Sequence, residues 1–146
     1  MHTRVLILAF SAVLALAGLA GALADGLGSG KFALLGPDGV AWCDGGGVVS
    51  GTDTGNGFAV INTSSDGTVS ATVSLKGLTP DTDYVIRLIQ GVDCYVVDAT
   101  VTTNRQGNAT VHLSEASVSG TAFIAVDEGS LFGAPMFVTE TYNQNP

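Results

Sequence analysis

The stretch Thr68–Gln90 reads TVSATVSLKGLTPDTDYVIRLIQ, and it decides the fold class. From Thr68 to Leu75, Ser and Thr alternate strictly with apolar residues. Side chains of a β-strand point to opposite faces with a period of two, so this pattern predicts a strand with one apolar and one hydroxyl-bearing face. A turn with Gly and Pro over 77–83 separates it from a second predicted strand, Tyr84–Gln90.

Short segments of the same kind recur along the chain, and no amphipathic helical pattern of useful length occurs. Ser50–Gly57 is read as the most turn-rich segment, and Asn104–Gly107 as a hairpin loop. Further strands are predicted over 31–35, 40–43, 58–62, 94–103, 109–113, 120–126 and 134–142. Many short strands separated by Gly-, Asn- and Asp-rich turns are typical of all-β proteins. The prediction is an all-β antiparallel sandwich or barrel of about seven to nine strands, and the sandwich is preferred because of the Pro-containing corner before Tyr84.

The phase of the alternation also predicts which side chains are buried. Ser70, Thr72, Asp98 and His112 are expected to face solvent. The predicted core comprises Val69, Ala71, Val73, Leu75, Tyr84, Ile86, Leu88, Val111, Leu113, Ile124 and Val126.

The N-terminus has the pattern of a secretory signal. Met1–Arg4 is short and basic, Val5–Ala24 is almost entirely apolar, and small residues, Ala22 and Ala24, precede Asp25. A retained membrane anchor is the alternative, since the apolar run is long enough to span a bilayer. We expect a signal helix over 1–24, a flexible leader over 25–30, one domain over 31–142 and a frayed tail over 143–146. The expected location is extracellular or in the cell envelope.

The composition is strongly acidic. The chain has 13 Asp and Glu, five Lys and Arg, and a formal net charge of −8. Such a surface repels nucleic acid and anionic lipid. We therefore expect no nucleic-acid partner and, once the signal is removed, no membrane span. Protein, carbohydrate or another copy of the chain at the cell surface are the expected partners.

Cys43 and Cys94 are the two cysteines. In an oxidising compartment an isolated pair predicts one disulfide, and a loop of about 50 residues would make it worth about 4 kcal/mol in the chain-entropy model. A reactive thiol is the rival interpretation, but no His or Lys lies close in sequence to activate one.

The segment Leu78-Thr-Pro80-Asp-Thr-Asp-Tyr84 resembles the tyrosine corner of fibronectin type III and related immunoglobulin-like domains. The resemblance implies an immunoglobulin-like sandwich in which the Tyr84 hydroxyl bonds back to the corner, with Gly77 permitting the turn and Pro80 restricting it. Cys94 lies ten residues after Tyr84, so the position of the antibody disulfide does not carry over. Thr102–Gly107, with the Asn-Ala-Thr that follows, is similar to small secreted prokaryotic sandwich proteins of unassigned function.

No catalytic residues are predicted. His112 is the one histidine after the signal segment, and it lies on the polar phase of a strand, where a solvated side chain is expected. One His and two cysteines expected to be oxidised exclude the common zinc sites and argue against Ser-His-Asp and Cys-His systems. Asp53-Thr54-Gly55 matches the tripeptide of aspartic proteases, but its neighbours place it in a wet turn, whereas those enzymes bury two carboxylates together.

Two kinds of modification or ligand site are candidates. The candidate calcium ligands are Asp44, Asp53, Asn56 and Asp66, which lie in Gly-rich turns. Their side-chain oxygens suit Ca²⁺, although the preference of Asp and Asn for turns explains these residues without an ion. Asn62 and Asn108 begin glycosylation sequons. No other cofactor is expected.

The sequence thus predicts a secreted or cell-surface, non-enzymatic β-sandwich domain with a structural or binding role. One alternative is a subunit of an extracellular filament, in which a segment such as Gly28–Leu35 inserts as a strand into a neighbouring subunit. The other is a homodimeric aspartic protease that uses Asp53.

Overall fold

The computed structural model describes residues 28–37, 51–91, 93–129 and 135–144. Every regular element in these residues is a β-strand. The strands are β1 (Gly28–Pro37), β2 (Gly51–Thr63), β3 (Thr68–Leu75), β4 (Asp83–Gln90), β5 (Tyr95–Thr102), β6 (Ala109–Ala116), β7 (Thr121–Glu128), β8 (Phe137–Val138) and β9 (Tyr142–Asn143).

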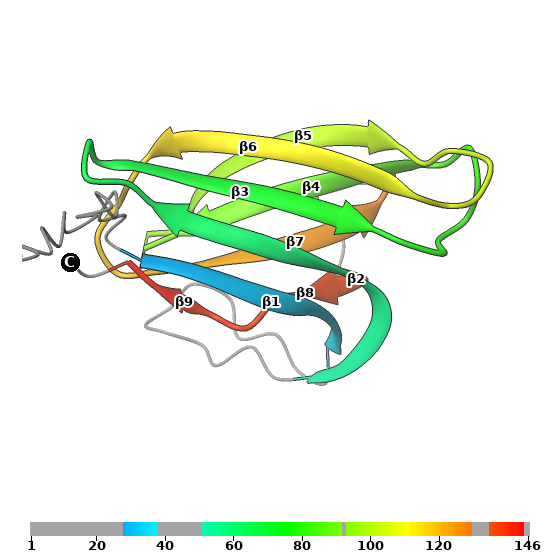
Figure 1. Cartoon of the computed structure of the whole chain (residues 1–146), viewed down its shortest axis with the longest axis horizontal. Coiled ribbons are helices and arrows are strands. Elements are labelled where there is room, and N and C mark those ends of the chain that lie inside the picture. Colours follow the sequence, from blue (N-terminus) through cyan, green and yellow to red (C-terminus); the bar gives the residue numbers. More distant parts are fainter. Residues whose placement is uncertain (1–27, 38–50, 92, 130–134, 145–146) are drawn as a thin grey trace, which may run out of the picture.

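The strands form one antiparallel sheet with the order β5-β4-β7-β8-β1-β2-β3-β6, and β9 pairs with β7. The sheet curls until its two end strands, β5 and β6, lie side by side without pairing, so the molecule is nearly barrel-shaped (Figure 1). The all-β prediction is confirmed. The immunoglobulin-like sandwich is not confirmed, because the sheet is continuous through a single residue pair, Leu35 with Val138, between β1 and β8.

The interior is filled by the apolar phase of each strand, as the alternation predicts. All the predicted core residues are buried except Val111, which is half-buried because it lies on the end strand β6. Asp98 and His112 are exposed, whereas Ser70 and Thr72, on the central strand β3, are half-buried. Residues outside the prediction complete this core: Leu34, Ala59, Ile61, Ala122, Phe137 and Tyr142.

A second apolar cluster lies on the outer side of β4 and β7. It consists of Leu35, Ile89, Phe123, Ala125 and Val138. Residues of both phases of β4 are buried from Tyr84 to Gln90, so this strand does not show the alternating burial of β3.

The turn between β3 and β4 forms the predicted corner. Tyr84 is 1% exposed, and its hydroxyl oxygen accepts the backbone N–H of Thr79 at 3.3 Å, as the tyrosine-corner resemblance implied. The Thr103 hydroxyl donates to the carbonyl of Thr79 at 2.6 Å. The N–H of Leu78 donates to the carbonyl of Gly107 at 3.0 Å. The corner is therefore tied to the loop between β5 and β6 as well as to Tyr84.

Gly107 is required by this contact. Its φ is +74°, and a Cβ at this position would lie 2.0 Å from the carbonyl oxygen of Leu78. Positive φ is readily available to glycine, and only a residue without Cβ allows the two backbones to approach this closely.

Three predicted elements differ from the structure. The segment 51–57 is not a turn between strands but the first part of β2, in which the register with β1 shifts between Ala33 and Leu35. Asn104–Gly107 is not a hairpin loop, because β5 pairs with β4 and β6 pairs with β3. The predicted last strand is two short strands, β8 and β9. The predicted strand 40–43 and the signal segment lie outside the described residues, and β1 begins at Gly28, within the expected leader.

Candidate functional site

The outer face of β1, β2, β3 and β6 is the candidate functional site. The alternation that buries one side of each strand directs the remaining side chains outward, and the register aligns them in rows across the sheet. The middle row is Lys31, Val60, Thr72 and His112, with Ala33, Phe58, Ser74 and Thr110 on one side of it and Ser29, Asn62, Ser70 and Ser114 on the other. We call these residues the hydroxyl face.

The hydroxyl groups of this face recur regularly in two directions. Along a strand, outward side chains repeat every second residue, about 6.7 Å, and adjacent strands lie about 4.8 Å apart. The hydroxyls are densest on the neighbouring strands β3 and β6, where they belong to Ser70, Thr72, Ser74, Thr110 and Ser114. Each hydroxyl can both donate and accept a hydrogen bond. The face therefore presents a repeating array of neutral hydrogen-bonding groups.

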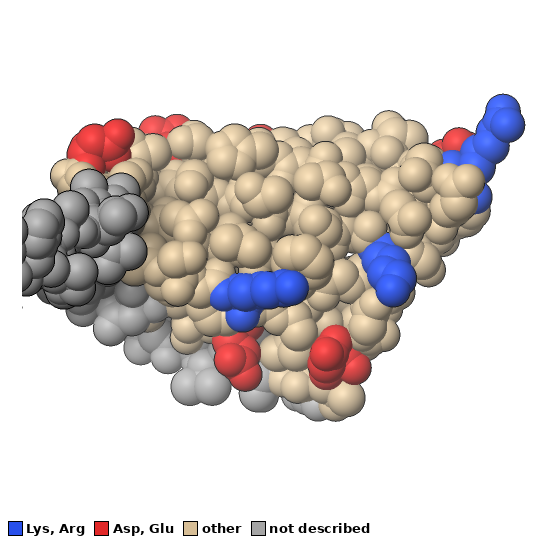
Figure 2. Space-filling model, viewed as in Figure 1, with Lys and Arg blue, Asp and Glu red and all other residues tan. Residues whose placement is uncertain are grey.

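The hydroxyl face carries no carboxylate, although the chain as a whole has a net charge of −8. Figure 2 shows this side of the molecule: Asp and Glu lie toward its rim, and its middle is free of them. A neutral polar surface loses its water at a lower cost in free energy than a charged one. Contact with an uncharged partner is thus easier here than on a face lined with carboxylates.

Two side-chain contacts shape the face. The Lys31 ammonium lies 4.0 Å from the centroid of the Phe58 ring, a cation–π arrangement. The Thr72 hydroxyl and the His112 Nδ1 are 3.2 Å apart, a hydrogen bond whose direction depends on the His tautomer. Lys31 covers the ring of Phe58, so the groups most open to a partner are the hydroxyls and His112.

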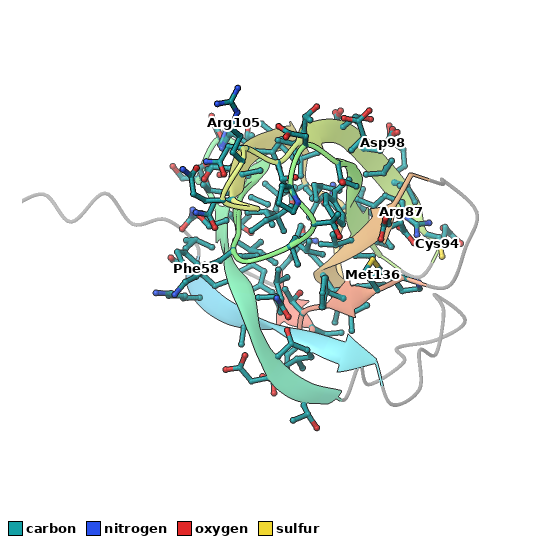
Figure 3. The ribbon with its side chains drawn as sticks, turned by 90° about the vertical axis from the view of Figure 1, so that its right-hand side faces the viewer. Phe58, Arg87, Cys94, Asp98, Arg105 and Met136 are labelled. Carbon is teal, nitrogen blue, oxygen red and sulfur yellow. The ribbon has the colours of Figure 1, made fainter. Side chains whose placement is uncertain are left out.

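The opposite side of the molecule carries a buried ion pair. Arg87 on β4 and Asp127 on β7 are 8% and 2% exposed, and the guanidinium Nη2 donates to Oδ2 of Asp127. Asp98 lies directly opposite Arg87 on β5 but is exposed. Figure 3 shows Arg87 and Asp98 on one side of the molecule and Phe58 on the other. Sequence reasoning missed this pair, because 40 residues separate its members.

The structure does not bring the described calcium candidates together. Asp53 and Asn56 lie near the beginning of β2, whereas Asp66 lies in the turn after its end. Asp53 and Asp66 each accept a backbone N–H two residues further on, from Gly55 and Thr68. These are the turn contacts that Asp favours without any ion. Asp44 lies outside the described residues, within which no cluster of three or more His, Cys, Asp and Glu could hold a metal.

The pKa of the Asp66 carboxyl should lie below its ordinary value. Hydrogen bonds from the Thr68 hydroxyl, the Ser64 hydroxyl and the Thr68 N–H lower the pKa of its carboxyl. A lowered native pKa stabilises the fold at pH values above the unfolded pKa, and this contribution is lost as the pH falls through the native pKa. We expect an NMR titration of Asp66 to have its midpoint below the ordinary value of 3.8. Thr68→Val should move that midpoint upward, and an unchanged midpoint would contradict the role of the hydroxyl.

The tripeptide Asp53-Thr54-Gly55 lies in the bulged part of β2. The Asp53 side chain is exposed, and its Oδ1 accepts the Gly55 N–H at 2.8 Å. The Thr54 hydroxyl donates to the Leu34 carbonyl at 2.9 Å. An exposed carboxylate in a local turn lacks the buried setting in which two carboxylates share one proton.

The disulfide and the glycosylation of the two sequons remain predictions. Cys43 lies outside the described residues, so its bond with Cys94 stays a prediction; the described part of the chain has no free cysteine. Asn62 is on the hydroxyl face and half-buried. Asn108 is exposed, and its Oδ1 accepts the Gly77 N–H at 3.1 Å.

Comparison with known proteins adds no relative: no family model, curated protein or solved structure matches the chain. In the described ranges no helix is long and apolar enough to cross a membrane. The hydroxyl face must therefore be interpreted from its own chemistry.

Proposed function

We propose that this protein is a non-enzymatic, secreted or cell-surface domain that binds a neutral, hydroxyl-rich polymer, of the polysaccharide class, through the hydroxyl face. The observation that carries the proposal is the array of aligned Ser and Thr side chains on a face without carboxylates. Sugar hydroxyls, like those of Ser and Thr, both donate and accept, so an extended polysaccharide can satisfy many of these groups at once. The signal-like N-terminus supports the location.

A non-enzymatic role is supported by the residues around the face. Its ionisable side chains are Lys31, which lies over the Phe58 ring, and His112, which is exposed and hydrogen-bonded to Thr72. No described cluster of His, Cys, Asp and Glu accompanies it. A hydroxyl activated by a base also needs a third group that orients the base, and the hydroxyl face holds no carboxylate beside Thr72 and His112 that could do so.

The immunoglobulin-like sandwich is also part of the proposal. The corner bond from Thr79 to Tyr84 supports it. So does the single residue pair between β8 and β1, which divides the strand order into two halves, β5-β4-β7-β8 and β1-β2-β3-β6. In this interpretation the hydroxyl face is the outer side of one sheet.

Binding to insoluble polysaccharide tests the proposal. Full-length protein should be retained by cellulose or chitin, and Thr72→Glu should weaken retention by about tenfold, because a carboxylate in the middle row must lose its water on contact. Thr100→Glu is the matched control: Thr100 is an exposed Thr on β5, outside the hydroxyl face, and its replacement should leave retention unchanged.

Thermal melts of both variants separate a binding defect from unfolding. Retention by neither polymer, or equal retention of wild type and Thr72→Glu, would contradict the proposal. Retention by alginate in place of the neutral polymers would show that the protein binds a carboxylated polymer. This result would contradict the proposal that its ligand is a neutral polysaccharide.

A further inference from the structure

Asn56 and Gly57 form the only Asn-Gly pair in the chain. Both residues belong to β2, and both are half-buried. In such a pair the backbone nitrogen of Gly can attack the side-chain carbonyl carbon of Asn and close a succinimide ring. The reaction is intramolecular, so its two groups are always close together. Gly is the most permissive second residue, because it has no Cβ to hinder the approach.

Asn56 lies at the end of the ladder between β2 and β3. Its carbonyl accepts the Lys76 N–H at 2.8 Å, and the register of the two strands begins with the next pair, Gly57 with Leu75. Hydrogen-bonded and non-hydrogen-bonded pairs alternate in an antiparallel ladder. The Gly57 N–H therefore points away from β3, so the nitrogen that must attack is not held by this ladder.

On its other side, Gly57 lies in the bulge of β2. The register with β1 shifts between Ala33 and Leu35, and Gly57 is paired with no residue of β1 in that register. The φ of Gly57 is +140°, and a Cβ at this position would lie 2.0 Å from the carbonyl oxygen of Ser74. The fold therefore requires glycine after Asn56, at a position where the regular pairing with β1 is interrupted.

The Asn56 side chain is held mainly at the end of the ladder. Its Nδ2 donates to the Lys76 carbonyl at 3.2 Å, and its backbone N–H donates to Thr54 Oγ1 at 3.3 Å. Strand ends open locally at a lower cost in free energy than the middle of a sheet. Opening at Lys76 frees the carboxamide to meet the Gly57 nitrogen while the rest of β2 stays paired.

We propose that Asn56 is a site of spontaneous deamidation in the folded protein. The Gly57 nitrogen loses its proton to solvent and bonds to Cγ of Asn56, and Nδ2 leaves as ammonia. Water then adds to either carbonyl carbon of the succinimide, and the bond from that carbon to nitrogen breaks. The products are aspartate and isoaspartate at position 56. Water is the only co-reactant, and nothing is oxidised or reduced.

Each event adds one negative charge beside the hydroxyl face. Asn56 precedes Phe58 by two residues in the unbroken ladder with β3, so its side chain lies on the same side of β2. The new carboxylate would stand at the end of a face that has none, next to the Lys76 carbonyl that Nδ2 contacted. An effect on polymer retention rests on the proposed function, whereas the modification itself does not.

Peptide mapping by mass spectrometry tests the modification on the full-length, folded protein stored in neutral buffer. Position 56 should gain the mass difference between an amide and an acid roughly tenfold faster than Asn62. Asn62 is the matched internal control, because it is also half-buried on β2 but is followed by Thr63. Asn56→Gln should abolish the gain at position 56, since the longer side chain closes a less favourable ring.

Buffer and denaturant distinguish the mechanism. The rate should rise from mildly acidic to mildly alkaline buffer, because the attacking nitrogen must lose its proton. A gain that did not depend on pH would overturn the ring closure. Equal rates at Asn56 and Asn62, or a gain at Asn56 only after denaturation, would overturn the proposal, since the folded strand would then protect the amide.

The modified protein also tests the link to the hydroxyl face. Anion exchange separates the more acidic form, which cellulose or chitin should retain roughly threefold less than the unmodified form. Equal retention of the two forms would contradict the expected effect on the face. Failure of the unmodified form to bind would contradict the proposed function, and the mass measurement at Asn56 would still decide the modification.

Discussion

Arg87→Met should destabilise the protein by about 3–5 kcal/mol, because it leaves a buried carboxylate without its cation. Arg87 and Asp127 bridge β4 and β7 beside the apolar cluster that contains Ile89 and Phe123. Asp127 is 2% exposed, and its second oxygen, Oδ1, has no hydrogen-bond partner among the described residues. The carboxylate therefore depends on Arg87 for its stabilisation, and without it must stay charged in a poorly solvated site or take up a proton.

Denaturant unfolding measures the effect, and a double variant isolates the pair. Arg87→Met with Asp127→Leu should recover most of the lost stability, since replacing a whole buried pair by apolar side chains is often neutral. Asp98→Asn is the control: Asp98 is exposed opposite Arg87, and this change should stay within about 0.5 kcal/mol. If Arg87→Met were as mild as Asp98→Asn, water would reach Asp127 and the pair would not be buried in solution.

The sequence predicts best the strands that have one buried face. In Thr68–Leu75 the period-two pattern gives both bounds of β3 and the burial of Val69, Ala71 and Val73. A slip of one residue would expose this entire apolar set, so the local pattern and the tertiary packing agree.

The turn signals of 50–57 are misread for a physical reason. Gly55 and Gly57 do adopt positive φ, as turn-favouring glycines should, but within the bulge of β2 and not between two strands. A bulge and a turn use the same backbone conformations, so composition alone does not separate them. In the same way, the loop 104–107 has hairpin chemistry but leads from one end strand of the sheet to the other.

The candidate site could be predicted only in part. The alternation shows that β3 has a hydroxyl-bearing face, but the rows that continue it onto β2 and β6 depend on long-range register. His112 is on the polar phase in sequence, as it is in the structure, but its neighbour Thr72 lies 40 residues away. Such contacts depend on which strands pair with each other. The alternation of polar and apolar residues within one strand does not show which strand will be its neighbour.

Tyr84→Ala should cost about 3–5 kcal/mol, whereas Tyr84→Phe should cost only about 0.5–1.5 kcal/mol. The ring is 1% exposed within the main core, so its removal empties a packed site. The hydroxyl accepts one N–H, from Thr79 at 3.3 Å, and Thr79 is an exposed residue whose N–H can turn to water when that acceptor is lost.

The corner is also held from the other side, which limits the effect of losing the Tyr84 hydroxyl. Thr103 donates to the carbonyl of Thr79 and accepts the N–H of Thr82 at 3.1 Å. Denaturant unfolding of both variants gives the ordering, and Tyr95→Ala, at a side chain 53% exposed, is the control that should stay within about 0.5 kcal/mol. Equal losses for Tyr84→Phe and Tyr84→Ala would mean that the hydroxyl bond, and not the packed ring, stabilises the corner.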